Sequence, residues 1–183
     1  MNHGTLNVLE ACVRNSIKRF VFASSAAVYG HVKILPIAEN VRLKPISPCG
    51  ASKVAAEEII NAYADLSLFE RIITLRLFNV FSPGKSDESA GVISKFKERI
   101  LKDLPPVIFG DGNQQRDFIS VDDVVDAIVM ALDPPKQANK GTFKIVTGVP
   151  TKIRDLLQDR IKFKLYLTEK YMGNPIYHDW YSK

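Results

Sequence analysis

The sequence predicts an α/β fold with a parallel sheet. Two short segments, 19–25 and 72–78, are mostly apolar, as expected of strands that are buried on both faces of such a sheet. Segments with helical periodicity lie before and between them, so helices and strands alternate along the chain. The 183 residues are enough for one domain and part of another.

The first helix is predicted at 4–15, where Leu6, Leu9 and Val13 fall on one side. A second helix, ending near Leu68, is predicted to follow Ser47-Pro48, because an N-cap serine followed by proline is a common helix start. The remaining predicted elements are a helix at 92–101, a strand at 107–109, a helix capped by Ser120 that ends at Leu132, and a strand at 142–147.

Composition excludes several classes of protein. The net charge is +5, of which +3 comes from residues 151–183, and no run of Lys or Arg marks a nucleic-acid surface. The two cysteines, Cys12 and Cys49, form no CxxC pattern, so we expect neither a disulfide framework nor a metal site. The sequence contains neither an apolar run of about 20 residues nor a signal peptide pattern. We therefore expect a cytoplasmic protein without a membrane span.

Several short motifs carry the chemistry. In chain order they are Gly4-Thr-Leu-Asn-Val-Leu-Glu-Ala11, Phe22-Ala-Ser-Ser-Ala-Ala-Val-Tyr-Gly30, Ser47-Pro-Cys-Gly-Ala-Ser-Lys53, Arg76-Leu-Phe-Asn-Val80 with Pro83-Gly84, and Gln115-Arg-Asp-Phe-Ile-Ser-Val-Asp-Asp123. Each alone has an ordinary structural explanation. As a set, over about residues 4–156, they resemble the extended short-chain dehydrogenase/reductase family, and within it the NAD-dependent epimerases and dehydratases, with UDP-glucose 4-epimerases most similar.

The resemblance implies a domain organisation. Residues 1–83 would be the C-terminal half of an NAD-binding Rossmann domain, 84–157 part of a small α/β lobe that binds a sugar nucleotide, and 158–183 a tail of unclear structure. The family's Gly-rich fingerprint, which holds the cofactor pyrophosphate, occurs nowhere in the sequence. We therefore expect a truncated member of the family.

The resemblance also implies a reaction, the isomerisation of a nucleotide sugar at C4. NAD takes a hydride from C4 and returns it to the other face, while a tyrosine removes the C4 hydroxyl proton with the help of a serine. A lysine one helical turn beyond the tyrosine favours the ionised phenol. Sugar dehydratases of the family place an Asp-Glu pair after the serine. Ala26 and Ala27 stand at those positions here, which favours the epimerase branch.

Carried over by position, the catalytic residues are Ser25, Lys53 and, in place of the tyrosine, Cys49. Ser24, Lys53 and Phe78 are expected to contact the cofactor. The residues expected to contact the sugar nucleotide are Ser25, Asn79, Val107, Phe109 and Arg116, with the Arg116 guanidinium on the diphosphate.

Cys49 is the main departure from the family pattern. Its sulfur lies several ångström nearer the backbone than a phenolic oxygen would, and proton abstraction needs hydrogen-bond reach of about 3 Å. Tyr29 is the nearby alternative, but in the family this tyrosine packs beside the site and is not the base. We therefore expect an epimerase-like chain that is impaired or inactive when isolated.

Two further expectations follow from the resemblance. The alternative to a weak enzyme is a non-catalytic remnant that only self-associates or binds a nucleotide sugar weakly. In either case we expect a homodimer formed through helices 4–15 and 50–68, with Val54, Ile59 and Ile60 available for packing.

Overall fold

The computed structural model describes residues 3–32, 35–82, 91–102, 104–133 and 139–158. The chain divides into two compact units, residues 1–80 with 119–148 and residues 81–118 with 149–183. Each unit is described by itself. Pro83-Gly84 and the predicted tail from residue 159 onward lie outside the described residues.

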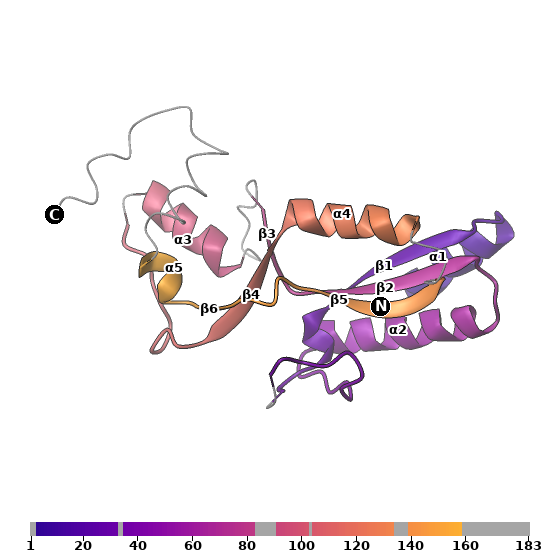
Figure 1. Cartoon of the computed structure of the whole chain (residues 1–183), viewed down its shortest axis with the longest axis horizontal. Helices are drawn as coiled ribbons and strands as arrows, with labels where there is room; N and C mark the ends of the chain where they lie inside the picture. Colours follow the sequence, from indigo (N-terminus) through magenta and orange to yellow (C-terminus); the bar gives the residue numbers. More distant parts are fainter. Residues whose placement is uncertain (1–2, 33–34, 83–90, 103, 134–138, 159–183) are drawn as a thin grey trace. The chain divides into compact units, whose positions relative to one another are not determined.

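The first unit contains the parallel sheet and its helices (Figure 1). In chain order its elements are α1 (His3–Arg14), β1 (Arg19–Ser25), the 3-10 turn η1 (Ala26–Val28), α2 (Pro48–Asp65), β2 (Arg71–Leu77), α4 (Val121–Leu132) and β5 (Lys140–Ile145). The strand order is β1-β2-β5, and both pairs are parallel. The predicted α/β fold with a parallel, Rossmann-type sheet is therefore confirmed.

The two faces of this sheet are covered by different helices. Ile72 of β2 packs with Leu9 of α1 and Ile60 of α2 on one face. Its neighbour Ile73 packs with Ala131 of α4 on the other face, and Figure 1 shows α2 and α4 on opposite sides of the sheet. Successive strand residues point to opposite faces, and each fully buried aliphatic side chain contributes about 1.5–3 kcal/mol.

Helix α2 begins as predicted and ends earlier. The Ser47 side chain accepts a hydrogen bond from the Gly50 backbone N–H at 3.1 Å, and Pro48 occupies the first turn. The helix ends at Asp65, not near Leu68, because Ser67 adopts a positive φ of 53° that a helix cannot continue through.

The other elements are β3 (Asn79–Phe81), α3 (Val92–Leu101), β4 (Gln115–Ser120), β6 (Pro150–Lys152) and α5 (Asp155–Gln158). The strands form a second sheet in the order β3-β4-β6, with β4 antiparallel to β6. The predicted strand at 107–109 is wrong. This segment is not paired in the described structure, and Phe109 is 80% exposed at the start of a turn in which Gly110 has a positive φ.

The two compact units differ from the expected division at residues 83 and 84 in one segment, and the expected roles of the domains stay predictions. Residues 119–148 belong to the first unit, because β5 pairs with β2 and α4 packs on the sheet. The chain therefore leaves the first unit after Val80 and returns at Ile119. Among the described helices, none is both long enough and apolar enough to cross a membrane.

Candidate functional site

Ser25 ends β1 and caps the short turn η1. Its backbone is extended, and its hydroxyl oxygen accepts a hydrogen bond from the Ala27 backbone N–H at 3.2 Å. A hydroxyl is both donor and acceptor, so this contact leaves the O–H hydrogen of Ser25 for a ligand. Ser25 thus lies at the carboxyl end of a parallel strand, which is where ligands bind in open α/β sheets.

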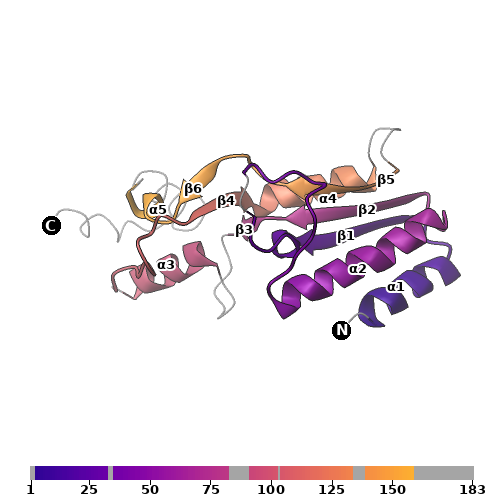
Figure 2. The same ribbon diagram turned by 90° about the horizontal axis from the view of Figure 1, so that it is seen from below.

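The first turns of α2 carry the other two predicted catalytic residues. Cys49 is exposed, and Lys53 follows it by four residues on the same helix face. Lys53 Nζ donates a hydrogen bond to the Ala23 backbone oxygen at 2.6 Å and lies 4.7 Å from the centre of the Phe22 ring. Figure 2 shows the start of α2 beside the carboxyl end of β1. The structure therefore places Lys53 at the strand end that carries Ser25.

Gly50 allows α2 to approach η1 closely. A Cβ on this residue would lie 2.5 Å from the backbone oxygen of Ala27 and 3.0 Å from Cβ of Pro45. Because a backbone oxygen cannot move aside as a flexible side chain can, any side chain at position 50 would separate the two segments. The glycine thus sets the spacing between the first turn of α2 and the turn that follows Ser25.

The two remaining residues predicted to contact the cofactor lie in the same unit. Ser24 is 3% exposed, and its hydroxyl donates a hydrogen bond to Glu57 Oε1, so this side chain is engaged inside the protein. Phe78 follows β2 directly, and its half-buried ring lies 6.3 Å from the Tyr29 ring. Cofactor contact by Ser24 and Phe78 stays a prediction.

The residues predicted to contact the sugar nucleotide are divided between the units. Asn79 is an exposed residue of β3 in the first unit. Val107, Phe109 and Arg116 belong to the second unit, where Val107 is 42% exposed and Arg116 Nη1 donates to the Gln115 backbone oxygen at 2.7 Å. Their joint contact with a sugar nucleotide stays a prediction.

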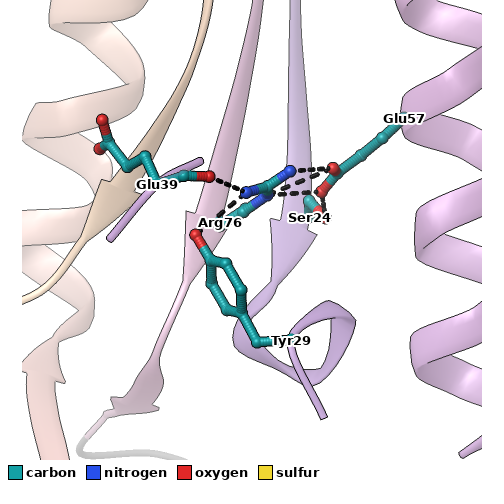
Figure 3. Close-up of polar contacts among 5 residues, drawn as sticks. All are labelled: Ser24, Tyr29, Glu39, Glu57 and Arg76. Carbon is teal, nitrogen blue, oxygen red and sulfur yellow. Dashed lines mark hydrogen bonds and ion pairs between the residues drawn. The ribbon is translucent and has the colours of Figure 1, made fainter. Parts of the chain in front are cut away.

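A buried polar network, which the sequence analysis missed, includes Ser24, the residue directly before Ser25 (Figure 3). Arg76 Nη2 donates to Glu57 Oε2 at 2.7 Å, and Arg76 Nε lies 3.2 Å from both carboxylate oxygens. Arg76 Nη1 donates to Tyr29 Oη and to the backbone oxygen of Glu39, each at 3.0 Å. Glu57 also accepts the hydrogen bond from Ser24. The network therefore joins β1, η1, α2, β2 and the loop that contains Glu39.

Arg76 stays charged in this environment. Burial by itself lowers the pKa of Arg76, but the hydrogen bonds with Glu57 and Tyr29 outweigh burial and raise the pKa above its ordinary value. Tyr29 is 1% exposed with its oxygen held by Arg76, so its phenol is not directed to an open site. That Tyr29 is not the base stays a prediction.

One sequence signal could have indicated this network. Arg76 interrupts the apolar segment 72–78, and a charge in a buried strand must be paired. The sequence does not tell which acidic residue pairs with it, because Glu57 and Glu58 are adjacent and only Glu57 is buried. In the described residues, no group of three or more His, Cys, Asp or Glu could hold a metal ion.

Comparison with known proteins identifies the family. Residues 2–146 match the model of the NAD dependent epimerase/dehydratase family. The chain is 43% identical over 164 residues to a protein of Methanocaldococcus jannaschii named "Putative UDP-glucose 4-epimerase", with 88% of this chain and 52% of that protein covered.

Two solved structures share the fold. The UDP-glucose 4-epimerase of Thermotoga maritima, solved with UDP-glucose, has a TM-score of 0.77 and 35% identity, covering 90% of this chain and 51% of its own. The Thermus thermophilus UDP-glucose 4-epimerase, solved with NAD, has a TM-score of 0.73 and 34% identity, covering 85% and 51%. This chain spans about half the length of these relatives. It belongs to the NAD dependent epimerase/dehydratase family.

Proposed function

We propose that this chain is a UDP-sugar 4-epimerase-type protein of the UDP-glucose and UDP-galactose class, impaired when isolated. The observation that carries the proposal is the position of Ser25 and Lys53 at the carboxyl end of β1, in a chain of this family. The impairment is inferred from Cys49, which takes the position of the family's tyrosine.

The residues present fit one half of the NAD cofactor. The Lys53 ammonium and the Ser25 hydroxyl lie at the sheet edge where dinucleotides bind, and Lys53 would hold the hydroxyls of the nicotinamide ribose. Bound NAD would supply the hydride acceptor and donor. The sequence has no Gly-rich loop for the pyrophosphate, so this chain offers only part of a cofactor site.

Ser25 and Cys49 would act on the sugar. The Ser25 O–H is available to donate to the C4 oxygen, which would orient the C4 hydroxyl for loss of its proton. The proton acceptor would have to be at position 49, four residues before Lys53. Because a thiol reaches less far than a phenol, we propose that Cys49 removes this proton from the C4 hydroxyl poorly.

The test restores the tyrosine in a completed protein. The parts of a family epimerase that this chain does not match are joined to it, with Cys49, Cys49→Tyr or Cys49→Phe, and conversion of UDP-galactose to UDP-glucose is measured. We expect the tyrosine version to exceed the cysteine version by at least about 10²-fold, the lower end for a positioned acid–base group.

The phenylalanine version is the matched control, because it supplies the ring without the hydroxyl. Equal rates for cysteine and tyrosine would mean that the thiol does the work of the phenol and would refute the argument against Cys49. If all versions are inactive although they bind NAD, the second candidate function stands: a non-catalytic chain that self-associates or binds a nucleotide sugar weakly. The exposed, short Cys49 side chain favours this candidate.

We also propose that the isolated chain binds NAD weakly. Lys53 can hold a ribose, but the family's pyrophosphate loop is not encoded in this sequence. Calorimetric titration of the isolated chain with NAD should give a dissociation constant larger than about 1 μM, which corresponds to a binding free energy smaller in magnitude than about 8 kcal/mol. Micromolar or tighter binding would contradict the proposal.

A homodimer through α1 and α2 is the remaining part of the proposal. One expectation about it changes: Ile60 is 2% exposed within its own core, so this side chain is not free for a partner, whereas Ile59 is only partly buried against the same cluster. Val8 of α1 is 51% exposed and remains available. Sedimentation at micromolar concentration should give a dimer that Val8→Asp weakens. A monomer in both cases would exclude this interface.

A further inference from the structure

We propose that Glu57 and Arg76 are positioning residues, which set the placement of α2 on β1 and so hold Lys53 at the strand end beside Ser25. That this placement of Lys53 matters for catalysis rests on the proposed function. The geometry itself can be tested without activity.

Two consecutive residues of β1 are bound by α2. Lys53 Nζ donates to the Ala23 backbone oxygen, and the Ser24 hydroxyl donates to Glu57. Lys53 and Glu57 are four residues apart and therefore share one helix face with Cys49, four residues before Lys53. A helix that is bound to a strand at two successive turns can neither slide along the strand nor rotate against it. Glu57 thus fixes the position of α2 along β1, and with it the position of the helix face that carries Lys53 and Cys49.

Ser25 is flanked by residues that the ion pair holds. Ser24, directly before it, binds Glu57, and Tyr29, four residues after it, binds Arg76. Arg76 in addition binds the backbone oxygen of Glu39 in the following loop. The strand end and the turn on either side of Ser25 are therefore anchored to the same pair.

Stability alone does not account for a charged pair at this depth. Glu57 is 2% exposed and Arg76 is 7% exposed, and taking both charges out of water carries a large desolvation penalty. Apolar residues of similar volume are often as stable as a buried ion pair or more stable. What an apolar pair cannot provide is the set of directed bonds: each nitrogen of Arg76 donates to at least one partner, and both oxygens of Glu57 accept.

The experiment measures how firmly Lys53 is held. The full chain is treated briefly with acetic anhydride, and acetylation of each lysine is followed by mass spectrometry. Lys95, an exposed residue of α3 in the second unit, serves as the internal reference because it lies away from α2 and β1 in the chain's other unit. The decisive variant is Glu57→Leu with Arg76→Met, which removes both charges together and is expected to stay folded.

In the folded double variant we expect acetylation of Lys53, relative to Lys95, to rise at least about fivefold, the factor for loss of one ordinary hydrogen bond. Glu58→Gln, at the exposed neighbouring glutamate, should leave the ratio unchanged. Denaturant unfolding of each variant separates release of Lys53 from general loss of stability. A folded double variant with an unchanged ratio would overturn the proposal.

Two milder variants decide the matter if the double variant unfolds. Ser24→Ala removes one link between β1 and Glu57, and Tyr29→Phe removes one bond to Arg76, without leaving a charge buried alone. Ser24→Ala should increase the acetylation of Lys53, because Ser24 is next to Ala23, whose backbone oxygen binds Lys53. Tyr29→Phe should increase it less. No increase with Ser24→Ala would reject the proposal. Failure of the epimerase test, by contrast, would leave these ratios unaffected, so the two results are distinguishable.

Discussion

Two turns of the same helix, α2, contrast sharply. The turn with Glu57 is buried, and its carboxylate is bound to Arg76 and Ser24. The first turn, two turns earlier, exposes Cys49, which we propose takes the position of the family's tyrosine. The buried charge of Glu57 thus has its partners, whereas the exposed turn carries the residue that departs from the pattern implied by the resemblance. Residues that hold a site are subject to packing and charge pairing, and a residue at an exposed turn can change without loss of the fold.

The largest expected effect on stability comes from the buried turn. Glu57→Gln leaves the Arg76 charge buried without its ionic partner and should destabilise the chain by about 3–5 kcal/mol. Denaturant unfolding followed by circular dichroism measures the change.

Two matched substitutions sharpen that comparison. Glu58→Gln makes the same chemical change at the exposed neighbouring residue, and Cys49→Ser changes the exposed first turn. Both should alter stability by no more than about 0.5 kcal/mol. If Cys49→Ser lowered the free energy of unfolding as much as Glu57→Gln, the exposed first turn would be as important for stability as the buried turn, and the comparison would fail.

An effect smaller than that of Glu57→Gln is expected in the first turn, at the buried Gly50. In Gly50→Ala the new methyl would meet the Ala27 backbone oxygen at 2.5 Å, and the forced shift should cost about 1–3 kcal/mol despite the better helix propensity of alanine. The same unfolding measurement applies.

Gly4→Ala in α1 is the control for Gly50. No atom lies within 4 Å of a Cβ there, so the substitution should be neutral or stabilising by up to about 1 kcal/mol. If both glycine substitutions stabilise the chain, then α2 and η1 have room to separate and Gly50 does not set their spacing.

The sequence by itself determined most of the local elements. The strand at Arg19–Ser25 and the helix at Val92–Leu101 have the predicted bounds, and the Ser120 side chain caps α4 by accepting a hydrogen bond from the Asp122 N–H. These features depend on a residue's own conformational preferences and on neighbours a few positions away. For that reason, periodicity and capping residues are sufficient to predict them.

Tertiary structure decided what depends on distant partners. The antiparallel pairing of β4 with β6 joins Arg116 to Thr151, and the return of β5 to the first sheet joins Leu75 to Phe143. Neither pairing has a local signal, because the partners are far apart in sequence. The apolar triplet at 107–109 satisfied a local pattern for a strand but is unpaired in the described structure.

The same reason applies to the site. The family resemblance predicted Ser25 and Lys53 as site residues, and the structure places both at the carboxyl end of β1, while their roles stay predictions. Which of two adjacent glutamates turns inward was decided by Arg76, a residue on a neighbouring strand, since only Glu57 faces it. A buried charge requires a partner in space, and that requirement can be met only once the chain is folded.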